Sequence, residues 1–445
     1  MKTPFVTTGT KPTSIRWRIL AILALASFIS YFLRTNLSFA APEMMSDLGL
    51  SEIQWGYVLA AFTAGYAIFQ FPGGILGDRF GPRRVLTGIV ILWAVLTVVT
   101  SLVPGKGDGE DTTSMVLIIG SLVLVRFLVG AAHAPLFPVM NASVVRWFPV
   151  GSWGLPLGLS STGLTLGGAA AAIALPLIIA LFGWRIAFLV IAPLGLLTAA
   201  LWWWYARDNP ADHAAVNDEE VELILAGRDE LVEPGQGEGQ DEESGQPDWL
   251  RVLKNRDILL LTLSYSSMNF VFYIVFNWFF YYLVEVREFS TTDAGFVASA
   301  QWIAGAAGAT LGGWLCDLMC KRLGLRWGCR WPIIIGMSVS AALLLVGALH
   351  PGPYIAVAAM VMLFFFNQMS EGPYWATSVA VGGKHAGAAG GVMNTGANAM
   401  GVVNALLVPF FAHTFGWTFA IASGALFAVI GIVFILLVRP DHTLK

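Results

Sequence analysis

The sequence predicts an all-α membrane protein with twelve transmembrane helices. Of the 445 residues, 56% are apolar and 12% are charged, whereas a soluble domain carries about 25% charged residues. Apolar stretches of about 18 to 28 residues recur along the chain, and each can cross a hydrocarbon layer of about 30 Å as a helix. The 48 glycines and 17 tryptophans fit helices that pack closely in lipid and end at the lipid–water boundary.

One long hydrophilic stretch, residues 206–256, divides these spans into two sets of six, and it contains an acidic, glycine-rich run at 233–248. Such a composition buries too little apolar surface to fold by itself. We therefore predict a six-helix bundle in residues 1–205, a flexible cytoplasmic linker in 206–256 and a second, pseudo-symmetric six-helix bundle in 257–445. The predicted spans are residues 17–41, 54–76, 85–103, 114–138, 154–181, 184–205, 257–284, 292–316, 331–349, 353–380, 387–412 and 416–438.

The basic residues indicate how the chain crosses the membrane. With these spans, the termini and the even-numbered loops hold 20 of the 25 Lys and Arg residues, and the opposite side holds only Lys106, Arg185 and Arg287. Loops rich in Lys and Arg stay in the cytoplasm, so we predict that both termini are cytoplasmic. A cleaved signal peptide ending at residues 38–40 is the weaker alternative for the first span.

Two glycine-rich motifs repeat between the halves. Residues 73–78 (GGILGD) follow the second span, residues 312–317 (GGWLCD) follow the eighth, and basic residues follow both motifs. Glycine allows close helix contact, and Asp78 can accept hydrogen bonds from a helix N-terminus or pair with a basic residue. An ordinary basic turn is the alternative for either motif alone. The predicted gating or structural residues are Gly74, Asp78, Arg79, Gly81, Arg83, Arg84 and, in the second motif, Asp317.

The first motif, with the basic residues after it, resembles the signature loop of the major facilitator superfamily. Its place after span two of twelve, with an echo after span eight, strengthens the resemblance. The resemblance implies the major facilitator fold, in which two six-helix bundles surround a midplane cavity that opens alternately to either side.

Arg34 and Arg126 fall inside predicted spans. A cation in the bilayer costs about 3 kcal/mol or more, so both side chains are expected to face the bundle interior and to have a partner there. The partner is either a carboxylate or carbonyl group of the protein or an anionic ligand. Arginine suits a carboxylate ligand, because its planar guanidinium bonds both oxygens and stays protonated. The pair therefore predicts a small organic anion as the ligand.

Longer segments resemble the anion:cation symporter family of that superfamily, which includes bacterial sugar-acid transporters, sialin and the vesicular glutamate transporters. In that family the matching arginines of the first and fourth helices contact or gate the anionic substrate. The resemblance implies a cation-coupled transporter in a bacterial inner membrane. The segments that carry it are residues 34–42 (RTNLSFAAP), 70–74 (QFPGG), 126–138, 146–149 (RWFP) and 390–398 (GGVMNTGAN).

The chain departs from the proton-coupled members at two positions. Those members carry an aspartate before the first arginine and a glutamate at the position of His133, whereas this chain has Leu33 and His133. His133 lies about 20° around the helix from Arg126, so it is either a packed histidine or a titratable group facing the same cavity. Glu371, the one acidic residue well inside a predicted span, either carries the coupling proton, pairs with an arginine or forms structural hydrogen bonds.

Other polar residues recur at helical spacing. Tyr265, Asn269, Tyr273 and Asn277 repeat every four residues, and Asn367, Glu371 and Trp375 do so in the tenth span. Each either contacts the substrate or forms hydrogen bonds between helices. The predicted substrate-binding residues, besides the arginines, are Tyr31, Tyr66, Tyr273, Asn269, Trp375, Asn394 and Asn398. The predicted coupling residues are His133 and Glu371, with a proton or sodium as the coupling ion.

Motifs for catalysis and cofactor binding are absent from the sequence: it has no Walker-type phosphate loop, zinc-ligand spacing or Gly-x-Ser-x-Gly. We predict neither enzyme activity, a cofactor nor a nucleic-acid partner. Cys316, Cys320 and Cys329 lie in a short basic region without a histidine in helical reach, and we interpret them as packing residues rather than a disulfide or metal site.

The predicted function is transport of an organic anion across the lipid bilayer by a monomer, coupled to a proton. Three alternatives stay open. The first is an uncoupled facilitator, and the second is a transporter-like receptor that binds without translocating. The third and weakest is an ion channel.

Overall fold

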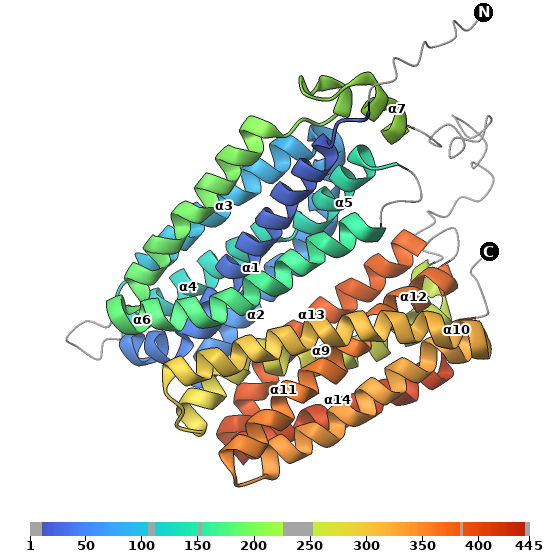
Figure 1. Ribbon diagram of the computed structural model, residues 1–445. Helices are drawn as coiled ribbons and strands as arrows, with labels where there is room; N and C mark the ends of the chain where they lie inside the picture. The colour runs from blue at the N-terminus through green and yellow to red at the C-terminus, as the bar shows by residue number, and fades with distance from the viewer. Residues whose placement is uncertain (1–10, 106–111, 150–153, 226–251, 383–385, 441–445) are drawn as a thin grey trace, which may run out of the picture.

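The computed structural model is almost entirely helical (Figure 1) and describes residues 11–105, 112–149, 154–225, 252–382 and 386–440. Within this part of the chain, nine helices or joined helices are long and apolar enough to cross a membrane. The predicted all-α membrane class is therefore confirmed. The acidic run predicted at 233–248 lies outside the described residues.

The helices of the first half lie side by side as one group in Figure 1. Their local sequence explains several boundaries. Ser51 and Gln54 form a capping box at the start of α2, and Gly81, with φ of 82°, separates α2 from α3. Gly183, with φ of 77°, bends α6 into two arms. The bounds are α1 Ile15–Leu48, α2 Glu52–Phe80, α3 Pro82–Ser101, α4 Thr112–His133, α5 Leu136–Trp147 and α6 Gly154–Tyr205.

The helices of the second half form another group (Figure 1). Gly324, with φ of 76°, bends α10 into two arms in the way that Gly183 bends α6. A π-helical turn, Tyr282–Val286, continues α9. The bounds are α9 Arg256–Tyr281, α10 Thr291–Leu349, α11 Pro353–Met369, α12 Glu371–Gly382, α13 Ala386–Phe415 and α14 Trp417–Leu437.

The fourth and tenth predicted spans are each interrupted. The fourth changes from α4 to α5 after His133, and the tenth changes from α11 to α12 just before Glu371. The repeated glycine motifs pack on these interruptions: a Cβ atom at Gly73 would lie 2.5 Å from Pro135 Cγ, and one at Gly312 would lie 1.8 Å from the Met369 carbonyl oxygen. The sequence repeat therefore corresponds to a repeated packing arrangement.

We call the end of the bundle where α1 begins and α14 ends the terminal end, and the other the opposite end. Toward the opposite end, two glycines join the groups. A Cβ atom at Gly56 in α2 would lie 2.4 Å from the Ala405 carbonyl oxygen in α13, and one at Gly295 in α10 would lie 2.4 Å from the Ala172 carbonyl oxygen in α6. No side chain fits at either position without separating the helices.

Glu52 adds a polar connection at the opposite end. Its Oε1 atom accepts hydrogen bonds from the Tyr281 hydroxyl at 3.2 Å and from the Trp417 indole at 3.0 Å. These donors belong to α9 and α14, whereas Glu52 begins α2. One carboxylate thus connects the first group of helices to two helices of the second.

Part of the predicted linker folds against the start of α1. A short 3₁₀ turn, Pro210–Asp212, and the helix α7, Asp218–Leu225, follow α6. The buried Glu220 carboxylate accepts from the backbone N–H groups of Ile15 and Arg16 at 3.1 and 3.2 Å, and it pairs with the Arg16 guanidinium at 2.9 Å. The first N–H groups of a helix have no acceptor within the helix, and the Glu220 carboxylate accepts from two of them. Its negative charge is also favourable at a helix N-terminus.

We expect Glu220→Ala to lower the free energy of unfolding by about 2 to 3 kcal/mol, because it leaves several donors without an acceptor. Thermal unfolding of the purified protein in detergent measures the effect. Glu222→Ala removes an exposed carboxylate two residues away and should leave the melting temperature unchanged. Equal melting temperatures for the two variants would contradict a capping role for Glu220.

We expect Glu52→Ala to loosen the opposite end. Losing about 1 kcal/mol of hydrogen bonding raises the population of the open arrangement about fivefold. Hydrogen–deuterium exchange of the segments that contain Tyr281 and Trp417 should accelerate accordingly. Glu285→Ala, which removes an exposed carboxylate near the same end, is the control. Unchanged exchange in Glu52→Ala would show that the carboxylate does not hold the groups together.

Candidate functional site

Both predicted arginines lie inside the helix bundle, near the middle of their helices. Arg34 of α1 is 8% exposed and Arg126 of α4 is 3% exposed. Arg126 lies close enough to Arg34 to be affected by its charge. The expectation that these cations face the interior rather than lipid therefore agrees with the structure.

Neither arginine has a carboxylate partner within the described residues, where the ion pairs are Arg16–Glu220, Arg146–Asp208 and Arg185–Asp47. Aromatic rings surround the guanidinium groups instead. The Arg34 guanidinium carbon lies 5.2 Å from the centroid of Phe62, and that of Arg126 lies 5.5 Å from the same ring. Arg34 has three further rings at 5.0 to 5.3 Å, those of Tyr31, Tyr66 and Phe276. The ring faces attract the cations but do not neutralise them.

Tyrosine and asparagine side chains complete the surroundings of Arg34. The hydroxyl groups of Tyr31, Tyr66 and Tyr273 interact with its charge. Tyr273 donates a hydrogen bond to Asn398 Oδ1 at 3.1 Å, and Asn398 Nδ2 donates to Gln70 Oε1 at 3.4 Å. The structure thus gathers four of the predicted binding residues, Tyr31, Tyr66, Tyr273 and Asn398, around Arg34.

Three other predicted binding residues have different surroundings. Asn269 donates to the Tyr265 carbonyl oxygen of its own helix at 2.9 Å. The carbonyl oxygen of Asn394 accepts from Asn398 at 2.8 Å. Trp375 is 38% exposed, and its indole donates to Glu371.

The sequence analysis missed several residues of the site. Phe62, Phe276 and Trp302 form its aromatic wall, and the Trp302 ring lies 5.7 Å from that of Tyr31 in an edge-to-face arrangement. An adjoining cavity is lined by Thr35, Phe276, Gln301, Trp302 and neighbouring residues. Aromatic residues are frequent throughout this chain, so the sequence carried no signal that would single these out.

Several buried polar atoms at this level of the bundle have no hydrogen-bond partner in the described part of the chain. They are Nε of Arg34 and of Arg126, Nδ2 of Asn277, Oε1 of Gln301 and both side-chain polar atoms of Asn36. Buried polar groups are normally satisfied by protein, water or ligand. Other buried atoms without a partner, such as Trp55 Nε1, Trp202 Nε1 and Asn404 Oδ1, lie elsewhere in the described chain.

His133 lies beside the arginine pair and is fully enclosed. Its ring stacks on Trp93 at 4.4 Å between centroids, and its Nδ1 lies 2.9 Å from the Val129 carbonyl oxygen. Both arginines are electrostatic neighbours of the ring. His133 is therefore packed and hydrogen-bonded, and it also lies near the charges of Arg34 and Arg126.

Glu371 belongs to a different cluster. One carboxylate oxygen accepts from the Tyr265 hydroxyl at 2.7 Å and from the Trp375 indole at 2.8 Å. Tyr265 precedes Tyr273 by eight residues in α9, so this cluster lies about 12 Å from the level of Arg34, toward the terminal end. Glu371 forms no ion pair with either arginine.

The predicted gating loop is held by a residue that sequence reasoning did not select. Asp208 Oδ1 accepts from the backbone N–H of Arg83 at 2.8 Å and lies 3.9 Å from the Arg146 guanidinium. The Arg83 guanidinium donates to the backbone carbonyl oxygen of Trp203, and its carbon atom lies 4.3 Å from the centroid of the Trp203 ring. Asp208 falls in the predicted linker, which concealed its role. Arg79, Arg84 and Asp317 are exposed, and Gly74 and the side chain of Asp78 lie outside the description.

These features define a helical membrane protein with a cationic, aromatic-lined site in its interior. A sequence profile of the Major Facilitator Superfamily matches residues 23–323. The chain belongs to this superfamily.

Relatives cover nearly the full length of the chain. A probable sulfoacetate transporter of Cupriavidus necator is 30% identical over 90% of this chain and 88% of its own length. A probable galactarate/D-glucarate transporter of Bacillus subtilis is 30% identical over 92% and 89%. A hexuronate transporter of Bacillus subtilis is 28% identical over 93% of both chains. The predicted family resemblance is confirmed, and these names indicate a transporter rather than an enzyme.

Solved structures share the fold. A bacterial homologue of the human lysosomal transporter Spinster, inward-facing and unoccupied, superimposes with a TM-score of 0.76 at 17% identity over 97% of this chain and 98% of that one. A D-xylose–proton symporter gives a TM-score of 0.74 at 14% identity over 97% and 100%. At these identities the likeness concerns the fold alone.

Proposed function

We propose that this protein moves a small organic anion across a membrane by alternating access. The observation that carries the proposal is the pair of buried guanidinium groups, Arg34 and Arg126, which have no carboxylate partner among the described residues. Two neighbouring buried cations repel each other, and a bound anion relieves that repulsion. Because arginine does not deprotonate in proteins, the site keeps its affinity for anions across physiological pH.

The surroundings favour a carboxylate that also carries hydroxyl or other polar groups, such as a sugar acid. Tyr31, Tyr66 and Tyr273 place hydroxyl groups around Arg34, and Asn277, one turn beyond Tyr273 on α9, offers an unpaired amide nitrogen. The relatives named for sulfoacetate, galactarate or glucarate, and hexuronate support this class, since all are small organic acids.

The proposed topology has twelve spans in two six-helix bundles. Each arm of α6 and of α10 counts as one span, whereas α4 with α5, and α11 with α12, each form one interrupted span. The basic residues place the terminal end in the cytoplasm. With that orientation, Glu52 and the Gly56 and Gly295 contacts lie at the outer side and hold the two halves together there. The site lies within one chain, which supports a monomer.

Proton coupling through Glu371 is the second part of the proposal. Its carboxylate lies about 12 Å from the level of Arg34 and forms no ion pair with either arginine, so it is free to bind and release a proton during the cycle. His133, at the equivalent interruption of the first half, is the other candidate. Sodium is the alternative coupling ion, and an uncoupled facilitator is the alternative mechanism.

We expect Arg34→Ala and Arg126→Ala each to weaken anion binding at least about 100-fold, the equivalent of about 3 kcal/mol for a charged hydrogen-bonding partner. Isothermal titration of purified protein with sulfoacetate, D-glucarate and D-glucuronate measures this loss. Arg34→Lys should recover only part of it, because lysine lacks the planar two-donor geometry.

Arg185→Ala is the control for these variants, because Arg185 pairs with Asp47 outside the site. Its affinity should equal that of the unmodified protein. Folding is checked by gel filtration and thermal unfolding. If both arginine variants remain folded and bind with undiminished affinity, the proposed site is wrong.

We expect Glu371→Gln to abolish substrate accumulation driven by an inward proton gradient while preserving counterflow, because exchange needs no net proton movement. Uptake of labelled substrate into proteoliposomes measures both activities, with Glu285→Gln as an exposed carboxylate control. Uptake indifferent to proton and sodium gradients would favour the facilitator. Binding without counterflow would favour a receptor, and ionic currents far above carrier rates would favour a channel.

A further inference from the structure

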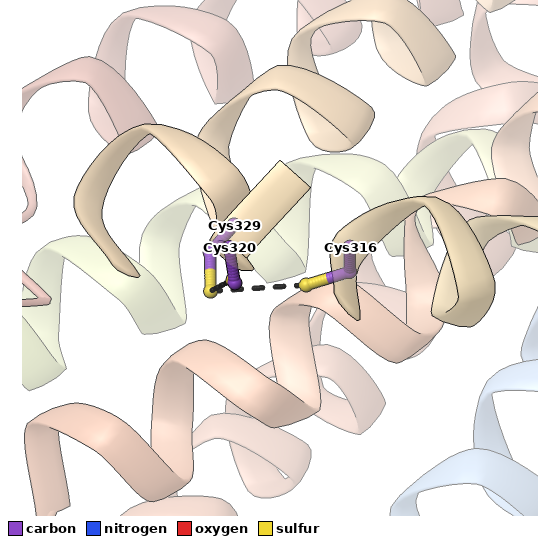
Figure 2. Close-up of side chains that lie close together, drawn as sticks. All are labelled: Cys316, Cys320 and Cys329. Carbon is purple, nitrogen blue, oxygen red and sulfur yellow. Dashed lines mark hydrogen bonds between the residues drawn. The ribbon is translucent and has the colours of Figure 1, made fainter. Parts of the chain in front are cut away.

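Three cysteine thiols converge beside the bend of α10, which lies at the terminal end of the bundle (Figure 2). The sulfur atoms of Cys316 and Cys329 are 3.8 Å apart, those of Cys320 and Cys329 are 3.7 Å apart, and all three lie within 4.8 Å of one another. All three are free thiols. We propose that this cluster binds one thiophilic metal ion, with Cu(I) preferred over Zn(II).

The fold explains how the cluster forms. Cys316 and Cys320 are one helical turn apart on the first arm of α10, and Cys329 lies on the second arm, beyond the bend at Gly324. The two arms touch closely, since a Cβ atom at Gly328 would lie 2.4 Å from Cys320 Cα. The interpretation of these cysteines as packing residues considered only helical neighbours, and the bend at Gly324 is what brings in the third thiol.

The spacing of the sulfur atoms suits a metal ion. With metal–sulfur bonds of about 2.3 Å, three sulfur ligands lie about 3.8 Å apart around a tetrahedral ion and about 4.0 Å apart around a trigonal one. Two of the observed distances, 3.7 and 3.8 Å, are within 0.1 Å of the tetrahedral value, and the third pair, Cys316 and Cys320, lies within 4.8 Å. Binding therefore requires only small side-chain rotations.

The donor set selects the kind of ion. Thiolates are soft ligands that prefer Cu(I) and Zn(II) over Mg²⁺ or Ca²⁺. No His, Asp, Glu or further Cys joins the three thiols among the residues that the structure describes, whereas structural zinc sites take four protein ligands. Cu(I) is stable with three thiolates, so the three-sulfur set favours it.

Charge and access are compatible with this role. Binding releases three thiol protons to solvent and leaves a Cu(I)–trithiolate of net charge −2. The exposed Lys321, Arg322 and Arg326 lie in the same segment, whereas the carboxylate of Asp317 is an electrostatic neighbour of Cys320 and Cys329. Cys316 and Cys329 are buried, but Cys320 is partly exposed and gives an ion a point of entry. The bound ion would join the two arms of α10 beside the repeated glycine motif, which contains Cys316.

The test is a titration of the reduced full-length protein in detergent with Cu(I) and, separately, with Zn(II), each in competition with a chromophoric chelator. We expect one equivalent of Cu(I), bound more tightly than Zn(II). Cys316→Ser, Cys320→Ser and Cys329→Ser should each weaken Cu(I) binding at least about 100-fold, and the triple serine variant should bind none. X-ray absorption of the loaded protein should show three sulfur neighbours.

A measurement on the unmodified protein guards against variants that fail to fold. Bound Cu(I) should protect Cys320 from alkylation by a maleimide, and removal of the ion by the chelator should restore the reaction. Equal Cu(I) binding by the unmodified protein and the folded triple variant would overturn the proposal, and so would unchanged alkylation of Cys320. Tighter binding of Zn(II) than of Cu(I) would overturn the preference for Cu(I).

Discussion

The burial of two positive charges without protein carboxylates is the constraint on which the rest of this structure depends. An unpaired buried ion costs several kcal/mol, and Arg34 and Arg126 impose that cost at the same level of the bundle. The shared Phe62 ring and the tyrosine hydroxyl groups offset part of it. The remaining imbalance is what makes a negative guest favourable in the bundle interior.

Much of this arrangement followed from the sequence, because hydrophobic length and the cost of buried charge are visible there. The apolar spans were predicted from hydrophobic length and the inward direction of Arg34 from the cost of a buried charge, and Tyr66 and Tyr273 were separate candidates for the site. Contacts between residues far apart in the sequence were not predicted. Glu220 and Asp208 stand in a hydrophilic stretch that resembles a plain linker, yet they hold the start of α1 and the loop before α3. Cys329 joins its partners only through a bend.

Both halves contain a helix interrupted at an equivalent position, between α4 and α5 and between α11 and α12, but with different residues beside the break. Glycines 73 and 312 pack on corresponding breaks, one preceded by His133 and the other followed by Glu371. An interrupted helix has backbone groups without regular helical partners. Side chains next to the break can also point in directions that a continuous helix does not allow. The equivalent positions therefore suit residues that respond to substrate or proton, one in each half.

The glycine contacts between the halves have an energetic consequence. Four residues after Ala405 stands Pro409, and four after Ala172 stands Pro176, so both carbonyl oxygens lack the helical N–H donor that another residue would supply. Against Gly56 and Gly295 they have only weak Cα–H donors. When the halves separate, water can donate stronger hydrogen bonds to the carbonyl oxygens of Ala405 and Ala172. Separation therefore leaves neither carbonyl oxygen without a donor. Under the proposed alternating access, this interface can therefore be exposed to water at little cost.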